Sequence, residues 1–321
     1  MANWLYISDS QDGWRNLGRD EYFLDHLAPE DMLLHFYING NAVIIGQGQN
    51  PWAECNLAAM ERDKVQLVRR ISGGGAVFHD SGNLNFSFIA GEAVYDVQRQ
   101  LGMILRAVQA LGIPCEFSGR NDLLADGRKF SGNAFCNRKM LRQHHGTLLI
   151  HADLTRLQNY LNVDPRKLKA KGVSSVRSRV CNLNEFVPGL SCEQMLSALK
   201  DAFRAEYGDY KLIESVDEAA VAPYIEKHAS DAWRLGKTPC FDLEIENRFQ
   251  WGNAQLLLTL RQSKVSGVKA YSDSIDAELP DEIERLLLGV DFGSRPMAQA
   301  LMQSEKAQVR EFAQYILEQG L

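Results

Sequence analysis

The chain has 321 residues, 45% of them hydrophobic and 24% charged, with a net charge of −6, as in an ordinary soluble globular protein. No stretch approaches the roughly 18 consecutive apolar residues of a membrane helix, and the N-terminus lacks the basic start and apolar run of a signal peptide. Six scattered cysteines without a CxxC pair argue against a disulfide framework or a zinc site. We therefore expect a cytoplasmic protein with reduced thiols, with no metal motif and no association with membranes.

Positive charge is concentrated in residues 127–184, called the basic block below. This segment holds twelve lysines and arginines but only two acids, a net charge of +10, so the remaining residues carry −16. A basic segment within an acidic protein favours an anionic partner such as a nucleotide, an acidic protein or nucleic acid.

The first half of the chain alternates short apolar runs with amphipathic stretches. Asp96 is a suitable N-cap for the longest of these stretches, which ends at Gly112. The mixed order favours an α+β domain with a mixed or antiparallel sheet over a regular βαβ repeat. The expected strands are Leu5–Ser8, Leu33–Ile38, Val43–Gly46, Gln66–Arg70 and Leu84–Ile89, and the expected helices are Trp14–Leu27, Glu54–Lys64 and Asp96–Leu111.

The second half contains further helical patterns and then a small meander. A polar Gly/Pro stretch at residues 234–239 is typical of a linker. We therefore predict a catalytic domain over 1–236 and a small α+β accessory domain over 237–321. The expected elements are a strand at Thr147–His151, helices at Asp153–Leu161, Ser191–Tyr207 and Asp217–Trp233 (with Pro223 setting the start of the last), strands at Phe241–Phe249, Asn253–Arg261 and Val265–Tyr271, and helices at Pro280–Leu288 and Pro296–Gln319.

Three consecutive glycines, Gly73, Gly74 and Gly75, follow the pair Arg69-Arg70 and precede the run Ala76-Val77-Phe78-His79. Glycine weakens a sheet region, so such a run indicates a backbone that lies against a ligand. Its N–H groups can turn toward an anion beside the fixed charge of arginine. The motif is neither a Walker phosphate loop nor a GxGxxG fingerprint.

Lys129 is the candidate catalytic residue. It follows the turn formers Asn121-Asp122 and Asp126-Gly127, and we expect it on an irregular segment between two strands. A lone loop lysine is usually solvated surface, but glycines on both sides, Asp122 upstream and the His144-His145-Gly146 segment downstream favour a site.

The motifs together resemble those of the lipoate–protein ligase A family, from about residue 5 to residue 260. The resemblance is carried by the segments Arg69–Asp80, Ser118–Asp122, Arg128–Gly132, His145–Leu149, Gln49–Cys55, Lys171–Arg179 and Trp233–Pro239.

The resemblance implies a fold shared with biotin–protein ligases and a two-step reaction. Lipoate would attack the α-phosphate of ATP, with Mg²⁺ expected, to give lipoyl-AMP. The acyl group would then pass to a lysine of a lipoyl-carrier domain, as in 2-oxoacid dehydrogenase E2 subunits or the glycine cleavage H protein. Lys129 would bridge the lipoyl carbonyl and the α-phosphate. The other implied contacts with ATP or lipoyl-AMP are Arg70, Gly73, Gly74, Gly75, Ala76, Val77, Phe78, His79, Asp122 and His145.

Two positions depart from the family pattern. Gln47 stands where arginine is common, and Gly18 replaces an alanine in the first helix motif. The lipoyl tail would need an apolar tunnel, for which the candidates are Leu17, Val43, Val77, Phe78 and Phe86. The resemblance also implies a swing of the C-terminal domain about Gly236–Pro239.

Three alternatives remain open. An ATP-independent octanoyl- or lipoyl-transferase would use a cysteine thiolate, for which Cys136 and Cys181 lie in the basic block. A biotin–protein ligase fits the spacing of the glycine motif less well. Nucleic-acid binding would require stacking aromatics, and the basic block holds only Phe130, Phe135 and Tyr160, so we expect no nucleic-acid partner.

Overall fold

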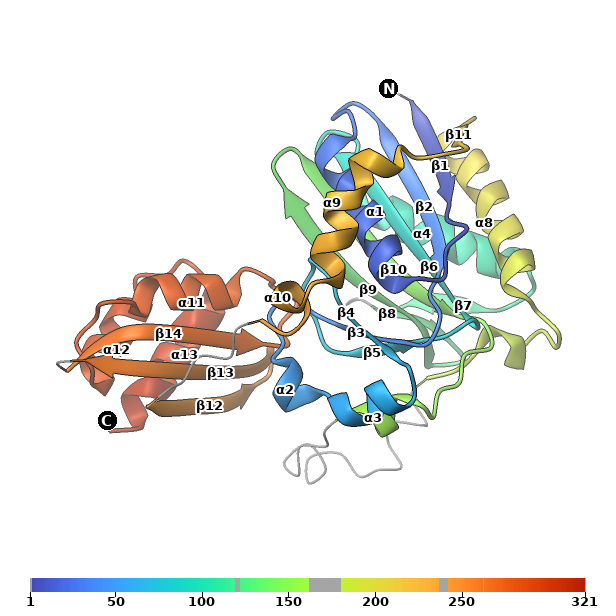
Figure 1. The fold of residues 1–321 in the computed structure, drawn as a ribbon. Coiled ribbons are helices and arrows are strands. Elements are labelled where there is room, and N and C mark those ends of the chain that lie inside the picture. The colour runs from blue at the N-terminus through green and yellow to red at the C-terminus, as the bar shows by residue number, and fades with distance from the viewer. Residues whose placement is uncertain (1, 119–121, 162–179, 237–241, 262, 321) are drawn as a thin grey trace. The chain divides into compact units, whose positions relative to one another are not determined.

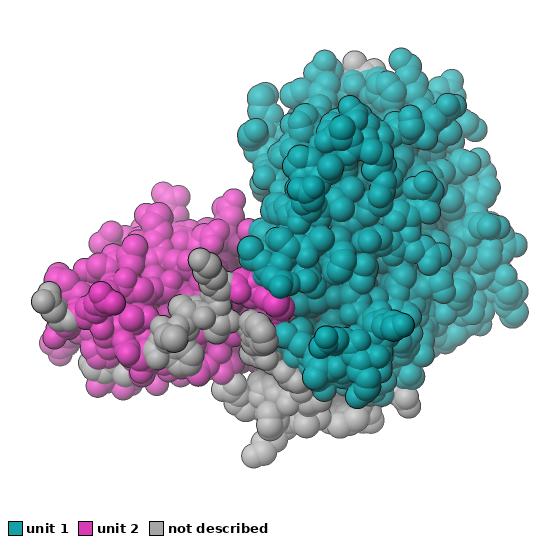
Figure 2. Space-filling view, viewed as in Figure 1, with its two compact units in different colours: residues 1–44, 54–69, 77–234 teal, residues 45–53, 70–76, 235–321 magenta. Residues whose placement is uncertain are grey.

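The computed structural model describes residues 2–118, 122–161, 180–236, 242–261 and 263–320. The chain forms two compact units, which Figure 2 shows in separate colours. The first unit consists of Met1–Ile44, Glu54–Arg69 and Val77–Arg234. The second consists of Ile45–Ala53, Arg70–Ala76 and Leu235–Leu321, so it includes two loops from the first half of the chain.

The first unit is built on an eight-stranded mixed sheet (Figure 1) with the strand order β11-β1-β2-β6-β10-β9-β8-β7. β1 runs parallel to β2 and β11, whereas β6 is antiparallel to both β2 and β10. The predicted mixed sheet is therefore confirmed. The strands are β1 (Asn3–Ile7), β2 (Met32–Ile38), β6 (Asn83–Gly91), β7 (Cys115–Phe117), β8 (Asp122–Ala125), β9 (Arg128–Arg138), β10 (Leu141–Leu149) and β11 (Lys211–Ile213).

Helices cover both faces of this sheet. α4 (Val97–Ala110) and α8 (Cys192–Tyr207) pack on one face, over a core that includes Phe86, Phe88 and Phe203. α1 (Gly13–His26) lies on the other face and packs against α9 (Glu218–Ala229). This unit also contains a small sheet with the strand order β4-β3-β5, formed by β4 (Gln66–Arg69), β3 (Ala42–Ile45) and β5 (Val77–His79). Its remaining helices are α3 (Leu57–Arg62), α5 (Leu157–Tyr160), η1 (Leu183–Glu185) and α10 (Asp231–Arg234). Of α2 (Pro51–Glu54), only Glu54 is assigned to the first unit.

The second unit contains the predicted antiparallel meander, β12 (Leu243–Phe249), β13 (Gly252–Arg261) and β14 (Lys264–Ser272). Leu256 and Leu258 of β13 pack against Ile283 and Phe312 of the helices. These helices are α11 (Leu279–Leu287), α12 (Ser294–Leu301) and α13 (Ala307–Glu318). No helix in the described ranges has the length and apolar character needed to cross a bilayer.

Several predicted helices have different bounds. Residues 153–156 are not helical, because the Asp153 carboxylate accepts hydrogen bonds from the Thr155 amide and hydroxyl and closes a turn before α5. Asp217 caps α9, so Pro223 lies inside that helix rather than at its start. The predicted helix over 296–319 is two helices, α12 and α13, and Ser304 accepts a hydrogen bond from the Lys306 amide between them.

The prediction of an irregular segment at Lys129 is also wrong. Lys129 is the second residue of β9 and lies opposite Leu124 of β8. The pairing shifts register between Leu123 and Leu124, because Leu123 lies opposite Ser131. Such a bulge redirects side chains while the strand continues.

Candidate active site

The predicted site residues fall into two groups, one in each unit. The second unit holds Arg70 and the loop 73–76. The first unit holds Val77, Phe78, His79, Asp122, Lys129 and His145.

The glycine loop is shaped by Arg70, whose side chain is buried. Its Nη2 donates to the carbonyls of Gly73 (2.7 Å) and Gly75 (2.8 Å), and its Nε donates to Gly73 as well (3.1 Å). The planar fork of a guanidinium suits two carbonyls of one tight loop. In this structure Arg70 therefore organises the loop backbone from within.

Glycine is required in this loop for space as well as conformation. Gly74 has a φ of 95°, a value that favours glycine. A β-carbon on Gly73 would lie 2.2 Å from the carbonyl oxygen of Ile275, and the Gly74 amide donates to the Ser274 carbonyl at 2.7 Å. The loop thus packs directly on the chain that follows β14.

Arg69 binds the C-terminal end of α10, whereas Arg70 binds the glycine loop. Its guanidinium donates to the carbonyls of Trp233 (2.9 Å) and Arg234 (2.9 Å), and the Trp233 indole N–H donates back to the Arg69 carbonyl (2.9 Å). A cation at the last carbonyls of a helix satisfies acceptors that the helix leaves open. Contrary to the prediction that Arg69 supplies charge beside the glycine loop, its guanidinium binds the end of α10.

Lys129 and Asp122 form an ion pair on the main sheet. Lys129 Nζ lies 2.8 Å from Asp122 Oδ1, and both side chains are a little over one-third exposed. The ammonium lies over Gly132, where a β-carbon would be 2.9 Å from Nζ. A larger residue at 132 would therefore displace the lysine.

The strand register brings Lys129 and His145 onto one face of this sheet. The Gly132 amide donates to Thr147 Oγ1 (3.3 Å), so these two residues face each other across β9 and β10. His145 is two residues from Thr147 along β10 and shares its face. The same face continues through Ser87 of β6, which pairs in register with His145, and through His35 of β2, which pairs with Ser87. This face is polar, unlike the apolar opposite face.

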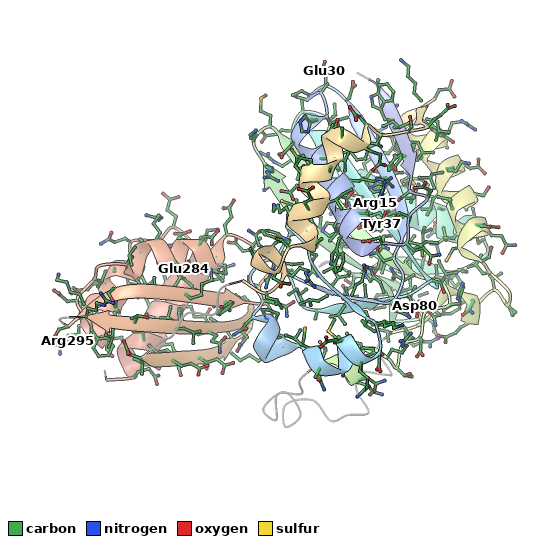
Figure 3. The ribbon with its side chains drawn as sticks, in the orientation of Figure 1. Arg15, Glu30, Tyr37, Asp80, Glu284 and Arg295 are labelled. Atoms are coloured by element: carbon green, nitrogen blue, oxygen red, sulfur yellow. The ribbon has the colours of Figure 1, made fainter. Side chains whose placement is uncertain are left out.

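His79 joins the same unit through a buried hydrogen bond. Its Nδ1 lies 3.0 Å from Asn39 Nδ2, and both residues are buried. Asp80 follows it (Figure 3) and accepts hydrogen bonds from the amides of Gly82 and Asp153. The strand after the glycine loop is therefore firmly held at its end.

A small apolar cluster lies between α1 and the β4-β3-β5 sheet and is the best candidate for an acyl-chain environment. It comprises Leu17, Tyr37 (Figure 3), Ala42, Ile44 and Val68, with Trp14 packed against it. Leu17 was a predicted tunnel residue.

The other tunnel candidates fit less well. Phe86 belongs to the main core on the face of the sheet opposite His145. The Phe78 ring stacks on Tyr160 at 5.7 Å, and Val77 is exposed. Val43 alternates with Ala42 and Ile44 and points away from their cluster.

The environment of the Cys181 thiol argues against covalent catalysis by this residue. Burial raises the pKa of this thiol to about 11, in spite of the nearby Arg128. Its Sγ lies 3.5 Å from the Arg128 carbonyl. Cys136 lies on β9 and is partly exposed. None of the cysteines among the described residues forms a disulfide.

Much of the described basic block is neutralised by acids from outside it. The ion pairs are Arg128–Glu185 (2.7 Å), Lys129–Asp122 (2.8 Å), Arg138–Glu21 (2.5 Å) and Arg142–Glu92 (3.2 Å). These cations therefore form ion pairs within the fold, in addition to any contact that they make with an anionic partner. The predicted motif Lys171–Arg179 lies outside the described residues.

The described part of the chain contains no group of three or more His, Cys, Asp or Glu side chains placed to hold a metal ion. Mg²⁺ commonly binds through one or two carboxylates and the phosphates of its substrate. Asp122 is the carboxylate of the first-unit group that could take part.

The buried link from Asn16 through Asn39 to His79 was not predicted from the sequence. Asn39 precedes a turn, as an ordinary loop asparagine would, so its local sequence carried no signal. Only the pairing of distant segments reveals it.

Comparison with known families agrees with this architecture. Residues 12–204 match the lipoyl protein ligase A/B catalytic domain, and residues 238–316 match the bacterial lipoate protein ligase C-terminus. The chain belongs to the lipoyl protein ligase A/B family, and it has the mixed sheet and C-terminal domain of a lipoate ligase.

Three solved structures are similar over much of the chain. The P. falciparum protein LipL1, in complex with lipoate, has a TM-score of 0.86 and 26% identity, covering 99% of this chain and 100% of its own. A bi-partite lipoate protein ligase from Thermoplasma acidophilum, analysed with its E2 lipoyl domain, has a TM-score of 0.67 and 27% identity, covering 76% and 100%. A lipoate-protein ligase A bound with ATP has a TM-score of 0.63 and 26% identity, covering 74% and 99%.

Proposed function

We propose that this protein is an ATP-dependent lipoate–protein ligase that acts in the cytoplasm. Lipoate attacks the α-phosphorus of ATP, a bond forms from the carboxylate oxygen to phosphorus, and the bond to pyrophosphate breaks. The acyl group of lipoyl-AMP then passes to the ε-amine of a lysine on a lipoyl-carrier domain, releasing AMP. Family membership carries this proposal, supported by similar structures that hold lipoate and ATP.

Lys129 is the proposed catalytic residue in both steps. Carboxylate attack on a phosphate brings two anions together, and a positioned ammonium stabilises the charge that develops. The contact with Asp122 supports a fixed direction for this ammonium. In the second step the same group would polarise the acyl carbonyl while the acceptor amine attacks.

The glycine loop is the proposed phosphate-binding element. Gly73, Gly75 and Ala76 would offer backbone amides, whereas Gly74, whose amide donates to the Ser274 carbonyl, would supply the bend between them, and Arg70 would hold the loop in shape through its carbonyls. Val77 and Phe78 would contact the nucleotide from β5, and His79 and His145 would contact the acyl phosphate. Mg²⁺, bound with the nucleotide, would offset phosphate charge, and Asp122 is the candidate carboxylate for holding it.

One experiment tests the reaction class. A lipoyl-carrier domain is incubated with the full chain and lipoate, with and without ATP, and its intact mass is measured. We expect a lipoyl adduct only with ATP, together with lipoate-dependent ATP–pyrophosphate exchange. A carrier adduct formed without ATP through an acyl-enzyme would instead support the cysteine transferase.

The carrier is proposed to be an acidic domain that docks near the basic block. E2 subunits of 2-oxoacid dehydrogenases and the glycine cleavage H protein are the carriers that the family suggests. Charge complementarity makes such docking sensitive to salt. A KM for the carrier that does not change between low and physiological ionic strength would contradict this part of the proposal.

A further inference from the structure

A chain of hydrogen bonds crosses the first unit from the end of β1 to His79. Ser8 Oγ lies 2.6 Å from Asn16 Oδ1, Asn16 Nδ2 lies 2.9 Å from Asn39 Oδ1, and Asn39 Nδ2 lies 3.0 Å from His79 Nδ1. Asn16 and Asn39 are fully buried, and His79 is only 4% exposed. Because water cannot replace these partners, the direction of each hydrogen bond follows from which groups can donate.

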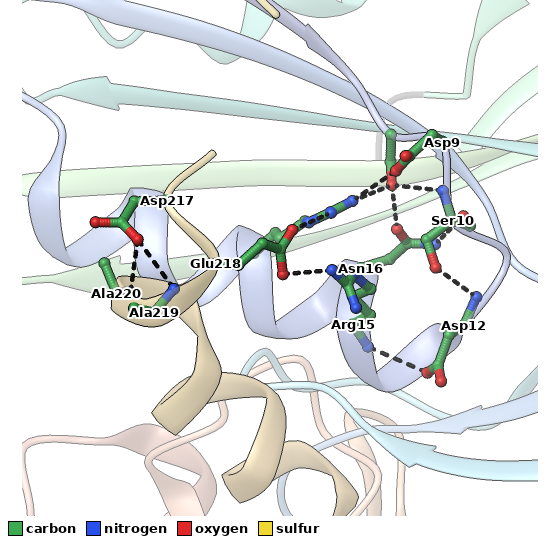
Figure 4. Close-up of polar contacts among 11 residues, drawn as sticks. Asp9, Ser10, Asp12, Arg15, Asn16, Asp217, Glu218, Ala219 and Ala220 are labelled. Atoms are coloured by element: carbon green, nitrogen blue, oxygen red, sulfur yellow. Dashed lines mark hydrogen bonds and ion pairs between the residues drawn. The ribbon is translucent and has the colours of Figure 1, made fainter. Parts of the chain in front are cut away.

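Arg19 fixes the outer end of this chain through Ser8, and Figure 4 shows the polar contacts around Ser10, Asn16 and Glu218 in this region. Its buried guanidinium is held by Glu218 (2.9 Å) and Asp9 (3.2 Å), and its Nη1 donates to Ser8 Oγ (2.9 Å). Arginine has donors only and does not lose its charge. Ser8 Oγ also accepts from the Ser10 amide (3.2 Å), so its single hydrogen points to Asn16 Oδ1.

A second contact fixes the Asn16 amide independently. Asn16 Nδ2 lies 2.9 Å from the Ser10 carbonyl oxygen, which can only accept. The nitrogen of the Asn16 amide is therefore on this side, and its other hydrogen donates to Asn39 Oδ1. Since the Asn39 oxygen is used in this way, the group that faces His79 is the Asn39 NH₂. Nδ1 of His79 must accept, so it carries no proton.

We propose that Asn39 is a positioning residue that fixes His79 as the neutral Nε2–H tautomer, so that this ring nitrogen donates a hydrogen bond to the acyl phosphate. The second half of this statement rests on the proposed function. A neutral imidazole has one donor and one acceptor nitrogen. With the proton on Nε2 it stabilises an anion without giving up a proton, whereas the other tautomer would present a lone pair to that anion.

The tautomer can be measured in the full chain without any substrate. Histidine is labelled with ¹⁵N, and His79→Gln identifies the His79 signals by their loss. In the wild type we expect Nδ1 unprotonated and Nε2 protonated. Asn39→Asp keeps the shape and the oxygen that accepts from Asn16, but it replaces the donor by an acceptor. We expect this variant to move the His79 proton to Nδ1. Asn137→Asp makes the same change at an exposed position of β9 and should leave the His79 signals unchanged.

A wild-type His79 that carries its proton on Nδ1 overturns the proposal, as does an Asn39→Asp variant whose His79 signals match the wild type. Asn39→Asp should also slow lipoyl-AMP formation by about 10²-fold, the scale for losing one positioned donor. A folded variant with the switched tautomer and the wild-type rate overturns the donor role. If the wild-type protein makes no lipoyl-AMP, the proposed function is contradicted, and this result is independent of the tautomer that is measured for His79.

Discussion

Lys129 Nζ lies 2.8 Å from Asp122 Oδ1 across the bulge between β8 and β9. This contact gives a long, flexible side chain a preferred direction on a face of the sheet that it shares with His145. An ammonium that is already directed needs less reorganisation when charge develops nearby. The first prediction tests both residues.

Lys129→Ala should slow lipoyl-AMP formation by at least about 10²–10³-fold, the scale for losing one positioned donor. Asp122→Asn should have a smaller effect, about tenfold, because it removes orientation but keeps the cation. ATP–pyrophosphate exchange measures both. Lys139→Ala, at an exposed position of the same strand pair, is the control. Near-normal exchange in Lys129→Ala would refute the catalytic assignment.

Arg70→Lys tests whether Arg70 is a shaping residue or only a charge. Lysine keeps the cation but cannot reproduce a fork that reaches the Gly73 and Gly75 carbonyls together. A lost hydrogen bond to a charged group costs about 1.5–3 kcal/mol. We expect Arg70→Lys to raise the KM for ATP nearly as much as Arg70→Ala does. Wild-type kinetics for the lysine variant would mean that charge alone suffices.

The buried ion pairs of Glu21 should make the free energy of unfolding depend on pH. Burial by itself would raise the pKa of this carboxyl, but hydrogen bonds from His228, Lys227 and Arg138 outweigh it and hold the pKa far below the ordinary value. A lowered pKa contributes stability at pH values above the unfolded pKa of about 4.5, and this contribution fades as the pH falls toward the folded pKa.

Glu21→Gln should therefore lower the free energy of unfolding at pH 7 by about 3–5 kcal/mol, the range for breaking a buried ion pair. Urea unfolding at a series of pH values measures it. The difference from the wild type should shrink below pH 4.5. Glu226→Gln, on the exposed side of α9, is the control. A difference that stays constant down to pH 3 would contradict the pKa assignment.

Cys181→Ala should leave ATP-dependent lipoylation within about threefold of the wild type. The thiol is buried and its pKa is about 11, so almost none of it is thiolate at pH 7–8. Intact-mass analysis of the wild type with lipoate and ATP should show no thioester on this residue. An acyl adduct mapped to Cys181 would revive the transferase alternative.

Gly18 and Gly102 should respond to alanine with opposite signs. A β-carbon on Gly18 would lie 3.0 Å and 3.1 Å from backbone atoms of Ile225, where overpacking costs about 1–3 kcal/mol. The gain in helix propensity is at most about 1 kcal/mol. On Gly102 the same atom would meet only the end of the Arg106 side chain, at 3.2 Å. We expect Gly18→Ala to lower the thermal midpoint and Gly102→Ala to raise it. Two shifts of the same sign would contradict the close α1–α9 packing.

Elements predicted from local sequence patterns, such as helix caps and alternating strands, were confirmed most often. Asp96 caps α4 by accepting from the Arg99 amide, and the meander of β12, β13 and β14 follows its alternating pattern. A helix was also predicted to begin at Asp153, whose residue type suits an N-cap equally well, yet its carboxylate closes a turn. A short polar side chain can satisfy either geometry, so local sequence does not decide between them.

The residue types at the candidate site could be predicted, but their partners could not. Arg69 and Arg70 are adjacent, yet one binds α10 and the other binds the glycine loop. The partner of Arg69 lies 164 residues away in the chain. Such pairings depend on tertiary packing, which no local pattern encodes. The same reason explains why the link from Asn16 through Asn39 to His79 was missed.

The glycine loop and residues 45–53 belong to a unit whose other members come from the last quarter of the chain. Their partners include the Ser274 carbonyl for Gly74 and the Ser272 amide for Gly48. During synthesis these loops leave the ribosome long before those partners exist. Contacts so distant in sequence form late, because a long loop must close first. We therefore expect the nascent chain to acquire an ordered triglycine bend only after its C-terminal segment has been translated.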